Sequence, residues 1–318
     1  MAVITDLALQ GIQVLAVLVL APLLTGFVRS VKARLLRRRG PSLIQPYRDL
    51  LRLFRKEVVV AENASWLFLA VPYVILASTW VAAALVPTFA TKLMFSWSAD
   101  LIAIVALLGL GRFALALAGM DVGTSFGGIG SSREMMIASL AEPAMLMIAF
   151  TVSIIAGSTQ LSTLANEMLT SNIGLRVSLG LALVALIMVA IAENGRIPVD
   201  NPATHLELTM VHEAMVLEYS GRHLALIELG ASVRLLLYVS LIACIFVPWG
   251  LAAPGDAWLS YVIGSVAYLG KLLIGGFALA LFETMTAKLR VFRVPDFLGA
   301  ALMLGLLGVL LRFVSRGL

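Results

Sequence analysis

Residues 193–222, ENGRIPVDNPATHLELTMVHEAMVLEYSGR, form a polar segment between two strongly apolar runs. The segment holds five of the eighteen acidic residues of the chain, and Pro198 and Pro202 prevent it from continuing as one helix. Carboxylates that lie beside a bilayer are costly to bury unless they are paired or hydrated. We therefore expect a folded loop docked against another part of the assembly, and we expect function there.

The remainder of the chain is too apolar for a water-soluble domain. Of its 318 residues, 61% are hydrophobic and 13% are charged, and the mean hydropathy is +1.01. Apolar runs of about 20 residues, the length that crosses a bilayer core, recur along the sequence. The composition predicts an all-α, polytopic membrane protein forming one integral domain over residues 1–318. We expect about eight spans, at 7–28, 66–87, 100–118, 134–156, 176–192, 224–249, 261–283 and 296–314.

Two features of the composition limit the chemistry of the chain. The first apolar run is longer than a signal-peptide core and lacks a small-residue cleavage site after it, so we interpret it as a retained span. The only cysteine, Cys244, lies within an apolar run, which excludes a disulfide and a thiolate metal site. Any redox centre must then lie on a partner.

The basic residues predict the orientation. The first connection, residues 29–65, carries ten Lys and Arg residues, and the odd-numbered connections together carry seventeen against four on the other side. By the positive-inside rule, the odd-numbered connections face the cytoplasm and both termini face the periplasm of a bacterial inner membrane. The cytoplasmic loops are then about 29–65, 119–133, 193–223 and 284–295.

The first cytoplasmic loop also contains a helix signal. Gly40-Pro41 indicates a turn, and Pro46 can begin a helix. Leucines and arginines then alternate through residue 55, as in an amphipathic helix at the membrane interface. The simplest alternative is an anchor for lipid headgroups only.

The second cytoplasmic loop is rich in glycine. It reads GMDVGTSFGGIGSSRE over residues 119–134, and Ser131 or Ser132 is expected to cap the fourth span. No Lys-Ser/Thr pair follows the glycines and no strand precedes them, so a phosphate loop is disfavoured. We expect the glycines to permit close backbone packing under a partner.

Glu142 lies eight residues into the fourth expected span and precedes Pro143. A carboxylate at that depth is a candidate functional group, and Pro143 could hydrate or kink the helix beside it. The alternative is a structural carboxylate paired with an arginine. The other ionisable residues expected within spans, which together suggest a polar path, are Glu228, Arg234, Lys271 and Glu283.

The histidines of the polar segment do not indicate a metal site. His205, Thr209 and His212 fall on one helix face, but the His-Glu-x-x-His pattern is absent, so a hydrogen-bonded interface is favoured over metal. Glu207, Glu213 and Glu218 do not share one stripe, which leaves a solvated face open. Apolar residues among them favour a surface that receives a cytoplasmic partner, and the carboxylates could have raised pKa values suited to proton transfer.

A series of motifs places the chain near a known family. The motifs are Gly40-Pro41, Gln45-Pro46, Asp49 and Lys56-Glu57; Arg133 with Glu142; Glu193, Arg196, Pro198 and Asp200; Glu207-Leu208; and Glu218-Tyr219. This series resembles the NuoH-type family, the complex I subunit at the membrane end of the quinone chamber.

Departures from the NuoH pattern point to one branch. Only three residues separate Gly40-Pro41 from Gln45-Pro46, where the quinone-reducing branch has a longer insert, and Ala203 and His205 replace two acids. The stretches GMDVGTSFGGIGSSRE and HLELTMVHEAMVLEYSGRHLAL are similar to the membrane subunits of group 4 [NiFe] hydrogenases, of the hydrogenase-4 and formate hydrogenlyase type.

The resemblance implies a subunit that catalyses nothing alone and binds no cofactor. It would anchor a cytoplasmic arm that carries the iron–sulfur and nickel–iron centres on small and large subunits, and would relay the reaction there to proton or sodium translocation by antiporter-like membrane partners. The alternatives are a quinone-binding subunit of NADH:quinone oxidoreductase and a stand-alone ion carrier. The implied proton path is Glu142, Glu193, Asp200, Glu207, Glu213 and Glu218, with Arg133 and Arg196 as charge partners; the implied docking residues are Arg37, Arg38, Arg39, Gly40, Pro41, Gln45, Asp49 and Asp121.

Overall fold

The computed structural model describes residues 2–91, 95–170, 177–196, 199, 211–253, 255–287 and 293–317. These residues form helices joined by short connections, with two isolated β-bridges and no strand among them. The helices are α1 (Ala2–Leu35), α2 (Gln45–Phe54), α3 (Trp66–Leu85), the 3-10 turn η1 (Ser96–Ser98), α4 (Leu101–Asp121), α5 (Ser125–Ala156), α6 (Leu161–Thr170), α7 (Val177–Glu193), α8 (His212–Val216), α9 (Gly221–Phe246), α10 (Trp258–Met285) and α11 (Val294–Gly317).

The multi-pass, all-helical prediction is confirmed. Within the described ranges, seven helices are long and apolar enough to cross a membrane, namely α1, α3, α4, α5, α9, α10 and α11. The expected span at 176–192 corresponds to α7, an apolar helix of 17 residues. That length is at the lower end of what spans a bilayer. The placement of both termini in the periplasm stays a prediction.

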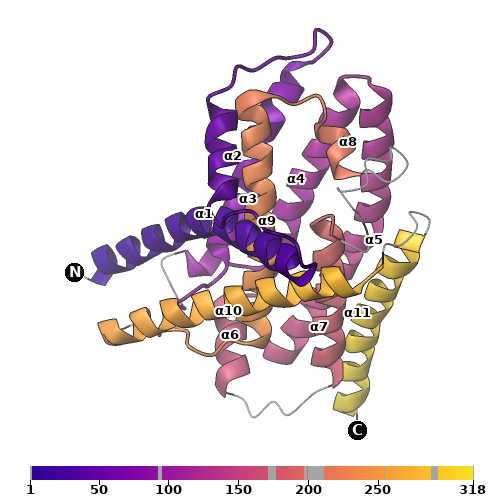
Figure 1. The fold of residues 1–318 in the computed structure, drawn as a ribbon. Helices are drawn as coiled ribbons and strands as arrows, with labels where there is room; N and C mark the ends of the chain where they lie inside the picture. Colours follow the sequence, from indigo (N-terminus) through magenta and orange to yellow (C-terminus); the bar gives the residue numbers. More distant parts are fainter. Residues whose placement is uncertain are drawn as a thin grey trace.

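The long helices form an upright bundle crossed by two tilted ones. Figure 1 shows α3, α4, α5 and α9 side by side, whereas α1 and α10 run across them at a steep angle. Helix α11 packs along α5 and α7, where Gly305 and Gly308 approach α5 closely and Thr151 donates a hydrogen bond to the Gly305 carbonyl at 3.2 Å. Small residues allow such close contact between membrane helices. The apolar core follows α9, whereas α10 and α11 are largely exposed.

The expected amphipathic helix is present as α2. It begins at Gln45 with Pro46 in its first turn, and it packs on α1 and α9. The Tyr47 hydroxyl donates to the Val19 carbonyl of α1, and burial raises the pKa of Tyr47. Leu51 and Phe54 are exposed, so α2 presents an apolar edge beside its arginines, as an interfacial helix does.

The glycine-rich loop is mostly helical, which corrects the predicted helix cap. Helix α5 begins at Ser125, and its cap is Thr124, whose side chain accepts from the Gly127 amide. Ser131 lies inside the helix, fully buried, and donates to the Ala116 carbonyl of α4 at 2.9 Å. Because Thr124 caps the first turn, neither Ser131 nor Ser132 caps the helix. Gly119, Gly127 and Gly130 pack against neighbouring helices of this chain, and close packing under a partner stays a prediction.

Candidate functional site

A buried ion cluster joins three helices of the bundle. Arg112 of α4 pairs through Nη2 with Glu193 at the end of α7, and its Nε lies 3.4 Å from Glu134 Oε1 of α5. The Arg112 side chain is 2% exposed. Burying an arginine and two carboxylates in apolar surroundings is costly unless they pair with one another. We call Arg112, Glu134 and Glu193 the α4–α5–α7 cluster.

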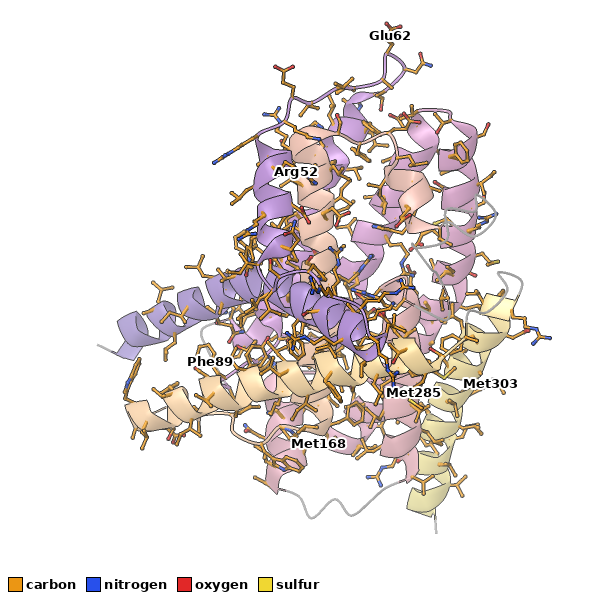
Figure 2. The ribbon with its side chains drawn as sticks, in the orientation of Figure 1. Arg52, Glu62, Phe89, Met168, Met285 and Met303 are labelled. Atoms are coloured by element: carbon orange, nitrogen blue, oxygen red, sulfur yellow. The ribbon has the colours of Figure 1, made fainter. Side chains whose placement is uncertain are left out.

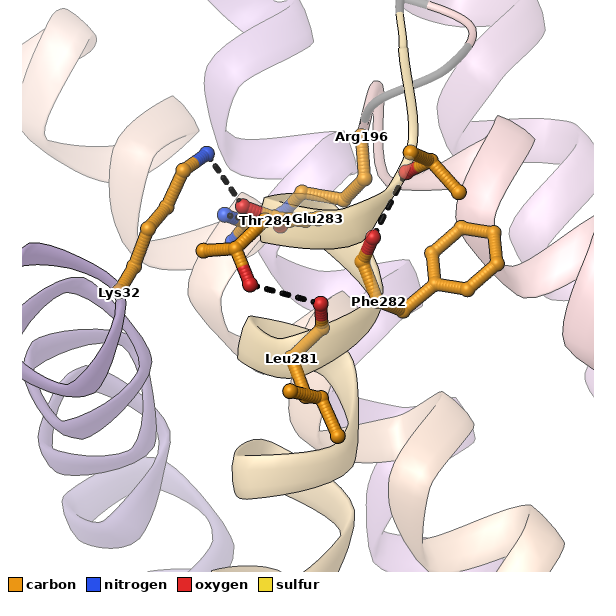
Figure 3. A network of polar contacts seen from close by, with 7 residues as sticks. Lys32, Arg196, Leu281, Phe282, Glu283 and Thr284 are labelled. Atoms are coloured by element: carbon orange, nitrogen blue, oxygen red, sulfur yellow. Dashed lines mark hydrogen bonds and ion pairs between the residues drawn. The ribbon is translucent and has the colours of Figure 1, made fainter. Parts of the chain in front are cut away.

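A second cluster joins the tilted helices to the end of α7. Lys32 Nζ of α1 lies 2.5 Å from Glu283 Oε2 of α10, and Arg196 Nη1 lies 3.4 Å from Glu283 Oε1 (Figure 3). Burial lowers the pKa of the Arg196 guanidinium, while Glu283 acts in the opposite direction. We call Lys32, Arg196 and Glu283 the α1–α10 cluster.

Glu142 lines a cavity of about 500 Å³ between α4 and α5. Arg112 lines the same cavity, and a side chain at Gly109 would meet Glu142 Oε1 at 3.3 Å. In the described part of the chain, Glu142 forms no ion pair. The alternative, a structural carboxylate paired with an arginine, therefore gains no support. The glycine leaves room for a carboxylate that faces a cavity large enough for water.

The structure distributes the other expected proton-path residues differently. Glu193 is buried in the α4–α5–α7 cluster, Glu213 is half-buried in α8, and Glu218 is exposed. Asp200 and Glu207 lie outside the described residues, as do His205 and Thr209. Of the two expected charge partners, Arg196 pairs with Glu283, and Arg133 is half-buried on α5.

The expected docking residues gather around the first loop. Five of them are exposed: Arg37, Arg38, Arg39, Gly40 and Pro41. Gln45 donates to Asp49 at 3.1 Å, and Asp49 lies 3.6 Å from Arg52. Asp121 accepts the Ser65 amide at 2.8 Å, so it fixes the start of α3 to the end of α4.

Contacts between distant loops join the first loop to the residues that precede α9. We call the first loop together with Tyr219 and Ser220 the rigid platform. Ser220 Oγ bonds both the amide and the carbonyl of Val59, each at 2.8 Å. Tyr219 stacks on Phe68 with ring centroids 3.9 Å apart and donates to the Phe68 carbonyl. The first loop, whose tip carries Glu62 (Figure 2), is thereby held against the start of α9.

The sequence signals miss the centre of the first cluster. The count of basic residues on the side expected to be cytoplasmic includes Arg112. Because Arg112 is buried within α4, that count falls from seventeen to sixteen. The position of Glu134 in the sequence indicates only a charge at a helix start. The available signal is an arginine in the middle of an apolar span, which requires a carboxylate from another helix.

Comparison with known proteins identifies the family. The sequence model of the family described as NADH dehydrogenase matches residues 8–313. The chain belongs to this family. The NuoH-type assignment drawn from the motifs is thereby confirmed.

Relatives within the family fall into two groups. Formate hydrogenlyase subunit 4 of Escherichia coli (strain K12) is 33% identical over 89% of this chain and 91% of its own length. Hydrogenase-4 component C of the same organism is 36% identical over 76% of this chain and 75% of its own. The NuoH-type subunit of the NADH-quinone oxidoreductase of Cupriavidus necator is 27% identical over 72% of this chain and 67% of its own.

A solved structure agrees with the fold. A chain of the membrane-bound sulfane sulfur reductase, an archaeal respiratory membrane complex, superposes with a TM-score of 0.79 over 98% of this chain and 99% of its own length. The two sequences are 17% identical, so this likeness concerns the fold alone. The chain is a multi-pass membrane protein whose relatives are subunits of formate hydrogenlyase, hydrogenase-4 and NADH-quinone oxidoreductase.

Proposed function

We propose that the chain is the membrane anchor and energy-coupling subunit of a complex I-like [NiFe] hydrogenase or formate hydrogenlyase of the bacterial inner membrane. The observation that carries this proposal is the pair of buried ion clusters inside a chain that is similar to hydrogenase membrane subunits over most of its length. Burying several charges in membrane helices is costly, and such groups mark ion pathways.

The rigid platform would receive the cytoplasmic arm. Its exposed arginines and the loop tied to Tyr219 and Ser220 offer a charged, preorganised surface to a small iron–sulfur subunit. The nickel–iron centre would lie on the large subunit of that arm, and no cofactor would bind to this chain. The residues described here include no group of three or more His, Cys, Asp or Glu side chains that could hold a metal ion.

The proton path would use buried carboxylates. Glu142 and Glu193 keep their expected roles, and Glu134 and Glu283 join them because each lies in an ion cluster. Glu213, Glu218, Asp200 and Glu207 would connect this path to the cytoplasmic face, with Arg133 and Arg196 as charge partners. Antiporter-like membrane subunits would continue the path.

The test is purification of the tagged complex in a gentle detergent, with its subunits identified and nickel measured. We expect hydrogenase-like subunits and nickel. Glu142→Gln should leave assembly and nickel content unchanged and abolish hydrogen evolution, because an amide cannot carry the proton. Asp256→Asn is the control, since Asp256 is an exposed carboxylate in the connection between α9 and α10.

The second candidate is the quinone-binding subunit of an NADH:quinone oxidoreductase. An apolar cavity of about 430 Å³ between α7, α9 and α10, with Tyr238 and Lys271 among its lining residues, favours it because ligand cavities have this size and character. A nickel-free complex that carries flavin-containing, NADH-oxidising subunits and bound quinone would establish this candidate and exclude the first.

A further inference from the structure

His212 of α8 lies between two small cavities. One is lined by Glu134 and Glu193, and the other by Thr79 and Arg112. Each has a volume of about 10 Å³, roughly the space that one water molecule needs. Among the described residues, the two cavities share two lining residues, His212 and Arg234. Within the described part of the chain, these two side chains are therefore the ones that a proton can pass in moving from one cavity to the other.

Of the two shared residues, only His212 can pass a proton. A guanidinium has donors and no acceptor, and it stays protonated inside proteins. A neutral imidazole has one N–H donor and one acceptor nitrogen, so it can accept on one side and release on the other. Among the described residues, no hydrogen bond to the His212 ring is formed, which leaves its nitrogens available for water.

The surroundings prevent His212 from trapping the proton. Burial and then the positive charge of Arg234 lower the pKa of His212 to about 3. Among the described residues, the charged groups that line its two cavities come from four helices: Arg112 of α4, Glu134 of α5, Glu193 of α7 and Arg234 of α9. Because a protonated ring is disfavoured beside two arginines, uptake at one nitrogen and release at the other should be concerted.

We propose that His212 relays protons between the α4–α5–α7 cluster and the Glu142 cavity through one water on each side. The carboxyl group of Glu134 or Glu193 gives its proton to the water in the Glu134–Glu193 cavity as that water gives a proton to one ring nitrogen. The other ring nitrogen gives its proton to the water in the Thr79–Arg112 cavity, which passes a proton on towards Glu142, so each water gains and loses one proton. One N–H bond forms and one breaks, no electron is transferred, and rotation of the neutral ring restores the first tautomer. This inference rests on the proposed coupling function.

The route continues from the second cavity to Glu142. Arg112 lines both the second cavity and the 500 Å³ cavity into which Glu142 faces. Arg112 is a positioning residue here, because its guanidinium holds Glu134 and Glu193 in place and does not itself exchange a proton. The relay therefore links the buried carboxylates of α5 and α7 to Glu142, which lines the cavity between α4 and α5.

The first measurement is proton translocation by inverted membrane vesicles that contain the whole complex, driven by reduced methyl viologen and followed with a pH-sensitive dye. We expect His212→Gln to lower the initial rate by about tenfold or more, with assembly and nickel content unchanged. Glutamine keeps a polar side chain but cannot accept and release a proton. Asp256→Asn should match the unsubstituted complex.

A second measurement separates relay from packing. In His212→Gly, added imidazole should restore translocation, whereas 1-methylimidazole, which fills the same space but lacks an exchangeable N–H, should not. Equal rescue by both compounds would assign His212 a packing role and overturn the relay. Unchanged translocation in His212→Gln would overturn the relay alone, while absence of translocation in the unsubstituted complex would overturn both the relay and the coupling function.

Discussion

The two ion clusters have opposite charge balance. The α4–α5–α7 cluster places one cation between two carboxylates, whereas the α1–α10 cluster places one carboxylate between two cations. They also differ in burial: the Arg112 side chain is 2% exposed, and those of Lys32 and Arg196 are 31% and 23% exposed. The first cluster is therefore suited to accept a proton, and the second to keep Glu283 ionised.

The comparison predicts its largest effect at Arg112. Arg112→Leu removes the cation with which two buried carboxylates pair and should destabilise the protein by about 3–5 kcal/mol. The expected outcome is loss of the assembled complex on native gels and a large fall in its melting temperature. Arg52→Ala, which removes a surface arginine near Asp49, should change stability by less than about 1 kcal/mol. Equal losses of stability in the two variants would show that the buried cluster stabilises the protein no more than a surface ion pair.

Substitution in the α1–α10 cluster should destabilise the protein less than Arg112→Leu. Glu283→Gln removes the one carboxylate between Lys32 and Arg196, but both cations are partly exposed and can be hydrated. We expect a loss of about 1–3 kcal/mol, measured as a shift in melting temperature of the purified complex. The double variant Lys32→Gln with Glu283→Gln should recover part of this loss because one unpaired cation is gone. A loss as large as that of Arg112→Leu would contradict the difference between the clusters.

Helix α8 adds a third test, because glycines hold it beside the first cluster. A side chain at Gly130 would meet Met215 Cγ at 2.9 Å and the Ala214 Cβ at 3.0 Å, whereas one at Gly128 would meet nothing within 4 Å. Gly130→Ala should cost about 1–3 kcal/mol and lower proton translocation by displacing His212. Gly128→Ala in the same helix should be neutral or stabilise slightly. Equal stability of both variants would contradict the close packing of α8.

The smallest effect concerns pH. Because the pKa of His212 falls from 6.5 to about 3 on folding, only the unfolded chain binds this proton between these values. This contribution therefore destabilises the protein as the pH falls below about 6.5, by about 1 kcal/mol over the first pH unit. His212→Gln should make the melting temperature of the complex less sensitive to pH between about 6.5 and about 5.5. An unchanged pH slope would show that the ring is accessible and titrates normally.

Local patterns of the sequence determine the elements. Apolar run length is sufficient to place the spanning helices, and Pro46 followed by alternating Leu and Arg is sufficient to place α2, because these signals act within one helix. The charged, proline-containing segment after α7 can also be recognised from the sequence alone. The predicted start of α5 is wrong because the cap at Thr124 competes with the more obvious serines.

The pairing of charges is decided only by the tertiary structure. Lys32 and Glu283 are separated by 251 positions, and no local pattern relates them. Arg112 meets Glu134 and Glu193 because α4, α5 and α7 are rotated and crossed so that these side chains point inward. That arrangement depends on close helix contacts at residues such as Gly119 and Gly130, which are made across the bundle rather than along the chain. The sequence supplies the buried charges, and helix packing selects their partners.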